Sequence, residues 1–319
     1  MKEREIAENN RILEIITGSH LYGTASETSD RDYVGIFLPS TEYVLGFKTI
    51  EEVDFSVVDK NEAGKNTEKA LDRKLYEFRK FMKLAMENNP NIIEILFANP
   101  ENIVYSNNIG KELLDIRHFF PYKGLKEKFL GYAFSQKHKM VIKKDNYFEL
   151  MDAVGFLKNQ NPGKIILEIA LGNCPYFLKK QLDKENNISF IKVGDLNLMP
   201  HITTKKAAEM ISDRLDKVGN REELLTKYGY DTKFASHLIR LMLEGIELLN
   251  TGEIKFPLQY AGTLRDIRNG KWSIEDIFNY SAELENEMSS VVEKSTLPLK
   301  PNTDLLERFT ILTLREAII

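Results

Sequence analysis

The stretch that decides the fold is GSHLYGTASETSDRD, residues 18–32, which follows the apolar run ILEIIT of residues 12–17. The apolar residues of Arg11–Thr17 predict a buried strand that ends in a turn at Gly18. A second segment rich in β-forming residues, Asp32–Leu38, begins where the quoted stretch ends and stops before a proline. The stretch therefore connects two predicted strands.

Two parts of this connection carry chemistry. At its start, Gly18 lets the backbone approach a phosphate closely, and the Ser19 hydroxyl and the amides of the next turn can bind phosphate oxygens. At its end, Asp30 and Asp32 are expected on one face of the second strand, because side chains alternate along a strand. A divalent cation would relieve the repulsion between the two carboxylates. Oxygen ligands favour Mg²⁺ or Mn²⁺, shared with the phosphates of a substrate.

Two acids at positions i and i+2 are weak evidence when they stand alone. The chain has 48 acidic residues among 319, so about seven such pairs are expected by chance. A lone pair is equally compatible with a solvated loop or an Asx turn. The complete order of strand, Gly-Ser, spacer, Asp-x-Asp and second strand is far rarer.

In this order the sequence resembles the active-site signature of the DNA polymerase beta superfamily, and more narrowly the RlaP group, which is predicted to act in RNA repair. The resemblance is carried by GSxxYG at 18–23 and SDxD at 29–32. It extends to YEFRKF (76–81), NPN (89–91), FASHLIRL (234–241) and STLP (295–298). It is weakest between residues 145 and 199.

The resemblance implies a third metal-binding carboxylate on a neighbouring strand. Asp72 fits best, just before the YEFRKF segment, and Asp54, on a strand expected over Val53–Val58, is its competitor. Asp72 could instead be the N-cap of the following helix. We expect Asp30, Asp32 and Asp72 to converge and to bind two Mg²⁺ or Mn²⁺ ions.

Four basic residues are further candidates for binding the nucleotide. Arg79 and Lys80 lie on the polar side of a helix expected over Leu75–Ala85, which either contacts a triphosphate or is a solvated basic face. His237 and Arg240 share one helix face and either close over the nucleotide from a second domain or pack in the core. His20 has no assigned role.

Helical spacing dominates beyond residue 120, and residues 186–198 are compatible with a hairpin. We therefore expect an α+β (mixed α/β) fold with two domains. Residues 1–119 would form a small mixed-sheet nucleotidyltransferase domain, and residues 120–319 a mainly helical domain that binds the acceptor or closes over the nucleotide.

The composition is that of a globular protein, with 42% hydrophobic and 29% charged residues and a net charge of −4. The single cysteine, Cys174, excludes an intrachain disulfide, and it is expected to be a passive thiol rather than a nucleophile. No signal peptide and no bilayer-spanning segment are recognised, so we expect a cytoplasmic protein with no membrane partner.

A basic segment suggests the acceptor. Residues 123–144 contain one acid, Glu127, and seven lysines: Lys123, Lys126, Lys128, Lys137, Lys139, Lys143 and Lys144. This segment is either a solvated helix face or a track for the phosphates of RNA, with Tyr122, Tyr132 and His138 available for stacking.

The expected activity is transfer of a nucleoside monophosphate from an NTP to a hydroxyl, most naturally an RNA end such as that of a tRNA, with release of pyrophosphate. Three rival classes share parts of this pattern. They are a toxin- or regulator-type nucleotidyltransferase that modifies tRNA or a protein, a metal-dependent phosphohydrolase and a non-catalytic nucleotide-binding module.

Overall fold

The structure, a computed structural model, describes residues 2–27, 29–59, 70–172, 178–183, 188–216 and 221–318. Cys174 lies outside these residues. The chain forms two compact units, one of Met1–Ser135 with Ser236–Ile319 and one of Gln136–Ala235. The expected domain boundary at residues 119–120 falls inside the first unit, because the first segment of that unit runs to Ser135. The chain also returns to this unit after residue 235.

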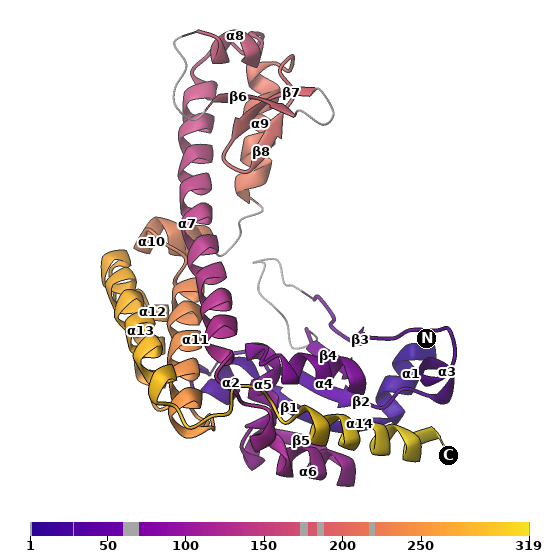
Figure 1. Cartoon of the computed structure of the whole chain (residues 1–319). Helices are drawn as coiled ribbons and strands as arrows, with labels where there is room; N and C mark the ends of the chain where they lie inside the picture. Colours follow the sequence, from indigo (N-terminus) through magenta and orange to yellow (C-terminus); the bar gives the residue numbers. More distant parts are fainter. Residues whose placement is uncertain are drawn as a thin grey trace. The chain divides into compact units, whose positions relative to one another are not determined.

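The first unit is built on a five-stranded mixed sheet with the strand order β3-β4-β2-β1-β5 (Figure 1). Strand β2 runs antiparallel to β1 and parallel to β4, while β3 and β5 form antiparallel edges. The strands are β1 (Arg11–Thr17), β2 (Asp32–Phe37), β3 (Glu52–Asp54), β4 (Asp72–Glu77) and β5 (Ile103–Ser106).

Helices cover this sheet. Helix α1 packs on β2 and β3 around a buried cluster that includes Phe37, Val53 and Leu75. Helix α14 brings the end of the chain back to α3 and α4 (Figure 1), where Phe309 meets Phe78 with 6.1 Å between ring centroids. The helices and 3-10 turns that belong mainly to this part of the chain are α1 (Lys2–Asn9), α2 (Gly18–Tyr22), α3 (Thr41–Val44), α4 (Phe78–Met86), α5 (Pro90–Leu96), η1 (Pro100–Asn102), α6 (Asn108–Asp115), η2 (Arg117–Phe119), α11 (Thr232–Thr251), α12 (Ala261–Arg268), α13 (Ile274–Lys294) and α14 (Thr303–Ile318).

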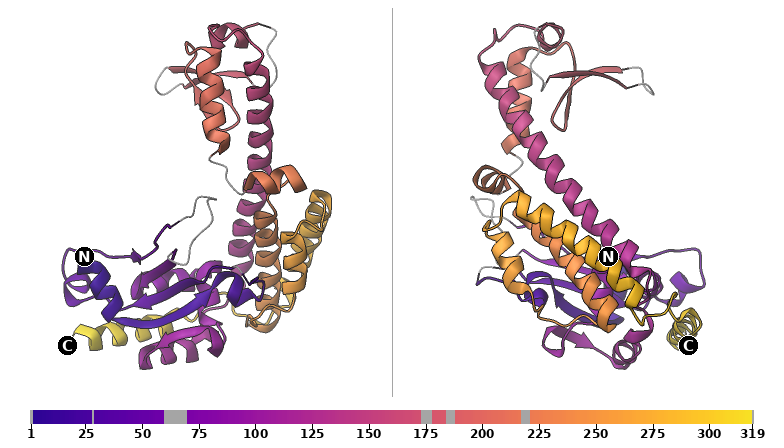
Figure 2. Two further views of the ribbon diagram at one scale, coloured as in Figure 1. Left: turned by 180° about the vertical axis from the view of Figure 1, so that it is seen from behind. Right: turned by 60° about the vertical axis from the view of Figure 1, so that its left-hand side comes forward.

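The helices α11, α12 and α13 lie side by side in both views of Figure 2. Their apolar stripes are buried, as at Leu238, Leu264 and Leu284. The long helix α7 (Leu125–Lys158) runs from the first unit into the second.

The second unit combines the end of α7 with a three-stranded antiparallel sheet of order β6-β7-β8. Its own core includes Leu150, Ile191, Leu198 and Ile211. The elements are α8 (Ile166–Ala170), β6 (Lys179–Asp183), β7 (Ile188–Val193), β8 (Leu196–Leu198), α9 (Thr204–Asp216) and α10 (Arg221–Tyr228).

Most sequence expectations about the fold are confirmed. The mixed-sheet first part, the mainly helical later part, the strand Arg11–Thr17 and the hairpin β7–β8 are present. The helix expected over Leu75–Ala85 is wrong at its start, because residues 72–77 pair with β2 as strand β4 and the helix begins at Phe78. None of the described helices is both long and apolar enough to cross a bilayer.

Candidate active site around Asp32 and Asp72

The turn after β1 requires a glycine for two reasons. Gly18 has φ +66°, in the left-handed region that side chains disfavour. A Cβ atom at this position would lie 2.6 Å from Oδ2 of Asp32, closer than a real Cβ contact allows. The Asp32 carboxylate therefore lies directly against the backbone at the start of α2.

The segment that carries Asp30 folds back onto α2. The Ser19 carbonyl accepts the N–H groups of Thr24 at 2.9 Å and of Ala25 at 3.0 Å. Nε2 of His20 lies 3.2 Å from the carbonyl oxygen of Ser29, the residue before Asp30. His20, which had no assigned role, thus contacts the segment that leads into β2.

The structure brings Asp32 and Asp72 together, with Asp30 just outside the strand. Asp32 and Asp72 are register partners on the parallel pair β2–β4, so their side chains share a face. Strand β2 begins at Asp32, so the expectation that Asp30 continues the strand alternation is wrong. Asp72 is the first residue of β4 rather than a helix N-cap. That role belongs to Glu77, whose carboxylate accepts the N–H of Lys80.

A pocket of about 370 Å³ opens beside this pair of aspartates. Asp72 lines it, whereas its sequence competitor Asp54 is not among the lining residues. Oδ1 of Asp54 instead accepts the N–H of Ser56 at 2.8 Å. The pocket is lined by Thr17, Gly18, Tyr22, Asp32, Tyr33, Val34, Asp72, Lys74, Tyr76, Asn91 and Glu94.

The Asp72 carboxylate is oriented by a serine on the neighbouring strand connection. The Ser56 hydroxyl donates to Oδ1 of Asp72 at 3.2 Å, and Oγ of Ser56 accepts the N–H of Arg73 at 3.2 Å. Ser56 thus fixes both the backbone and the carboxylate at the start of β4.

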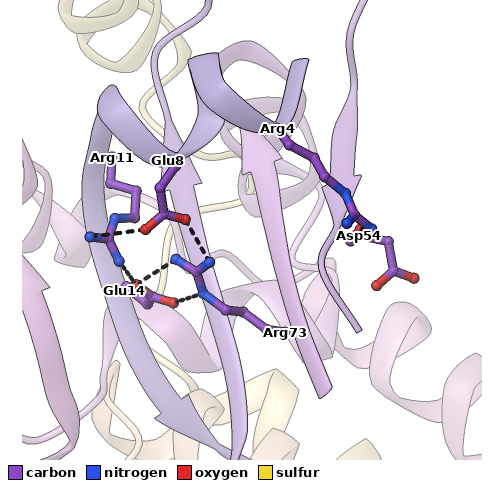
Figure 3. Close-up of polar contacts among 6 residues, drawn as sticks. All are labelled: Arg4, Glu8, Arg11, Glu14, Asp54 and Arg73. Atoms are coloured by element: carbon purple, nitrogen blue, oxygen red, sulfur yellow. Dashed lines mark hydrogen bonds and ion pairs between the residues drawn. The ribbon is translucent and has the colours of Figure 1, made fainter. Parts of the chain in front are cut away.

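Arg73 ties the opposite face of β4 to the rest of the sheet. Its guanidinium binds the buried carboxylate of Glu14 on β1 and that of Glu8 on α1 (Figure 3). Glu14 also pairs with Arg11 of its own strand. Since Arg73 follows Asp72 directly, this network holds the end of β4 that carries the candidate catalytic residue.

Two of the residues that line the pocket also belong to a buried cluster of charged and polar side chains. The Tyr22 hydroxyl donates to Oε2 of Glu94 at 2.7 Å, and Arg240 of α11 binds Oε1 of the same carboxylate. Arg240 also donates to both oxygens of Glu244, at 3.0 and 2.8 Å, and lies over the Tyr22 ring at 4.3 Å. The cluster thus couples α2 to α5 and α11.

Burial dominates the electrostatics of this cluster. It raises the pKa of Glu244 well above its usual value, and the nearby Glu94 adds to this effect, although Arg240 opposes it. Burial also raises the pKa of Tyr22 well above its usual value, so the phenol remains a hydrogen-bond donor. Arg240 keeps its charge because Glu244 and Glu94 outweigh the effect of burial on its pKa.

The four basic residues expected at the nucleotide are not among the residues that line the pocket. Arg79 donates to Glu77 and to the Tyr43 carbonyl, both at 2.9 Å, and Nζ of Lys80 pairs with Glu51 at 2.8 Å. Arg240 reaches the site only through Glu94. His237 is half-buried on α11, one turn before Arg240.

Sequence reasoning missed the roles of Glu94 and Lys74. Glu94 had a detectable signal, because it is the single acid in the otherwise apolar helix of residues 90–96, and such a buried carboxylate needs a partner. Lys74 had none, since it stands just before the helix expected over Leu75–Ala85, and strand β4 was not predicted.

The donor chemistry of the site fits a hard divalent cation. Across the described residues, no three His, Cys, Asp or Glu side chains are gathered tightly enough to form a ready-made metal site. Asp32 and Asp72 nevertheless present carboxylate oxygens on one face of the pocket, which are ligands that Mg²⁺ prefers. Asp30 lies two residues ahead of Asp32.

The lysines of residues 123–144 lie on or next to α7. Lys128 pairs with Glu87 at 3.3 Å, and Lys139 is exposed. The side chain of Lys143 is outside the described part of the structure. The lysines extend across the point where α7 passes from the first unit to the second.

Comparison with known proteins supports the sequence resemblance. The model of the family described as "RlaP: RNA repair pathway DNA polymerase beta family" matches residues 1–159. A protein of Enterobacteria phage T4, described as an uncharacterized 38.9 kDa protein in the nrdC-mobD intergenic region, is 27% identical over 301 residues, with 88% of each chain covered.

A solved structure with a remote likeness is that of a nucleotidyltransferase-like protein from Exiguobacterium sibiricum. It has 8% sequence identity and a TM-score of 0.26, with 99% of this chain and 78% of that chain covered.

The family match contains GSxxYG, SDxD, Asp72 and the whole pocket. It supports a nucleotidyltransferase of the polymerase beta type. Over residues 1–159 this chain is thus similar to the RNA repair pathway DNA polymerase beta family.

Proposed function

We propose that the protein transfers a nucleoside monophosphate from an NTP to a hydroxyl group at an RNA end and releases pyrophosphate. The observation that carries this proposal is the register of β2 and β4, which sets Asp32 beside Asp72 at a pocket whose wall includes Gly18. The family match supports the same reaction class.

Three carboxylates, those of Asp30, Asp32 and Asp72, would hold Mg²⁺ or Mn²⁺. Bound there, the metal would offset the negative charge of the reacting groups and favour ionisation of the attacking hydroxyl. Asp30 is not among the residues that line the pocket, and it would contribute its carboxylate from the segment just ahead of β2. The contact between His20 and Ser29 holds this segment near α2.

The protein groups would then mainly bind and orient the substrate. Gly18 and Ser19 would bind the β- and γ-phosphates, because the absence of a Cβ at Gly18 leaves room beside Asp32. The acceptor oxygen forms a bond to the α-phosphorus as the bond from that phosphorus to the bridging oxygen of pyrophosphate breaks. The acceptor loses its proton to a pocket carboxylate or to water. Positioning and charge neutralisation supply most of the rate in such transfers.

The test is to incubate the protein with each NTP labelled at the α-phosphate, with Mg²⁺ and total RNA, and with a protein extract in a separate reaction. Label in RNA supports the proposal. Label in protein alone would assign the chain to the toxin- or regulator-type class, and label in neither would refute transfer to both acceptors.

The lysines of residues 123–144 are proposed to bind the RNA phosphates. Each neutralised phosphate contributes about 0.7 to 0.9 to the slope of log affinity against log salt. Replacing Lys137, Lys139, Lys143 and Lys144 by Gln should therefore flatten the slope by up to roughly three units. An equal change of charge at the exposed, ion-paired Lys48, Lys179, Lys206 and Lys271 is the matched control. RNA affinity that responds equally to both sets would remove this segment from the interface.

A further inference from the structure

The charge of the pocket poses a problem for a nucleoside triphosphate. Asp32, Asp72 and Glu94 line the pocket, and Glu94 is almost fully buried. A polyanion that enters this pocket meets carboxylates and needs cations close to its phosphates. Among the residues that line the pocket in the described part of the chain, Lys74 is the basic one.

Lys74 is placed to meet a substrate phosphate by the geometry of β4. It follows Asp72 by two residues, so both side chains lie on the same face of the strand. In register it is the partner of Val34, another pocket residue two positions after Asp32. Lys74 thus occupies the next position on the same face of the strand after the paired aspartates.

Three nearby basic side chains form ion pairs away from the pocket. Arg73 points to the opposite face of the sheet, where Glu14 and Glu8 bind it (Figure 3). Arg79 and Lys80 pair with Glu77 and Glu51 and do not line the pocket.

Lys74 forms an ion pair in which a phosphate oxygen can replace the present partner. Its Nζ donates to Oε1 of Glu52 on the edge strand β3 at 2.9 Å, and both side chains are partly exposed, at 34% and 43%. Pairs of this kind contribute little to stability. A phosphate oxygen in the pocket offers Lys74 a stronger, charge-assisted hydrogen bond.

We infer that Lys74 binds the phosphates of the NTP, exchanging Glu52 for a phosphate oxygen when the substrate enters the pocket. Glu52 holds the ammonium group beside the pocket in the unliganded protein. This inference rests on the proposed nucleotidyl transfer and names a binding residue for it. It assigns to Lys74 the contact that the sequence suggested for Arg79 or Lys80.

The structure provides a matched control pair for the test. Lys80 and Glu51 form a second lysine–glutamate pair with almost the same distance, 2.8 Å, and a similar lysine exposure of 32%. Only the Lys74 pair adjoins the pocket. The two pairs therefore separate phosphate binding from a general effect of losing a surface ion pair.

The experiment measures the binding of inorganic tripolyphosphate with Mg²⁺ by calorimetry to the wild type, Lys74→Ala, Glu52→Gln, Lys80→Ala and Glu51→Gln. We expect Lys74→Ala to weaken binding roughly 10- to 100-fold, because a hydrogen bond to a charged group is lost. Glu52→Gln should bind equally or more tightly, because the competing carboxylate is gone. The control variants should stay within about twofold of the wild type, as surface pairs do.

The opposite response of Lys74→Ala and Glu52→Gln is decisive. Equal losses in both would mean that the pair is structural, and a loss confined to Lys80→Ala would return the contact to the neighbouring helix. Either result overturns the inference. Lys74→Arg, which keeps the charge, should restore most of the affinity.

The transfer assay separates this inference from the proposed function. If the wild type transfers a labelled nucleotide and Lys74→Ala does so with unchanged KM for NTP, only the assignment of Lys74 is wrong. If the wild type neither binds tripolyphosphate nor transfers a nucleotide, both proposals are wrong. A raised KM in Lys74→Ala, with the kcat ratio closer to one, supports both.

Discussion

Replacing Gly18 by Ala should separate activity from stability. The backbone at Gly18 has φ +66°, which costs an L-residue about 1–2 kcal/mol. The new Cβ would lie 2.6 Å from Oδ2 of Asp32, against at least 3.4 Å for an ordinary contact, so the carboxylate must retreat by about 0.8 Å. A side-chain rotation accommodates this at small cost to stability. Displacement of a reacting group by about 1 Å can lower the rate roughly 100-fold, so we expect a 10- to 100-fold loss of transfer.

Gly252→Ala is the control. Gly252 has φ +77°, and a Cβ added there would lie 3.7 Å from the nearest atom outside the neighbouring residues, which is an ordinary contact. Urea unfolding should show a similar loss of about 1–2 kcal/mol for both variants. The α-phosphate transfer assay should show a loss only for Gly18→Ala. Equal activities in two variants of equal stability would refute the argument that Gly18 makes room for Asp32.

The buried cluster makes two further predictions. Tyr22→Phe should lower the free energy of unfolding by about 1–3 kcal/mol, because Glu94 loses a buried donor, and Arg240→Leu by about 3–5 kcal/mol, because carboxylates are left unpaired. A smaller loss of unfolding free energy for Arg240→Leu than for Tyr22→Phe, measured in urea, would contradict this order. Since burial raises the pKa of Glu244, the folded state keeps this proton to higher pH than the unfolded chain. Stability should therefore fall as pH rises above the ordinary carboxyl range, by up to about 1.4 kcal/mol per pH unit, and Glu244→Gln should remove that slope. Identical slopes in urea titrations of the two proteins would show that Glu244 is not the group responsible.

The sheet could be predicted in part because its strands have local signals. The apolar run before Gly18 and the β-forming run after Asp32 are continuous in sequence, and they correspond to β1 and β2. Strand β4 could not be predicted from the sequence, because Leu75 and Phe78 also fit helical spacing. Its parallel pairing with β2 is a long-range contact that periodicity does not encode.

The site could be predicted where chemistry is concentrated in a motif. Asp32 and Gly18 belong to one short segment, and the resemblance led to Asp72, which lies in the same pocket. The partner of Lys80 could not be predicted, since Glu51 becomes its neighbour only when β3 pairs with β4. Glu77 is only two residues from Arg79, but residues two apart on the helix expected there would not face each other.

Arg240 shows the same limit over a longer distance. Its partner Glu94 is 146 residues away in sequence, and the helix pattern gives no information about that contact. The sequence left two alternatives for Arg240, closure over the nucleotide or packing in the core, and the structure buries its side chain behind the pocket.

The most direct test of nucleotidyl transfer follows both ends of the triphosphate. RNA and Mg²⁺ are incubated with an NTP labelled either at the α- or at the γ-phosphate, using the wild type and a folded Asp32→Asn variant. The account predicts that the wild type moves the α label into RNA and releases the γ label as pyrophosphate in equal amounts, and that Asp32→Asn does neither. Transfer of the γ label to RNA, release of label as inorganic phosphate without transfer, or full activity in Asp32→Asn would contradict it.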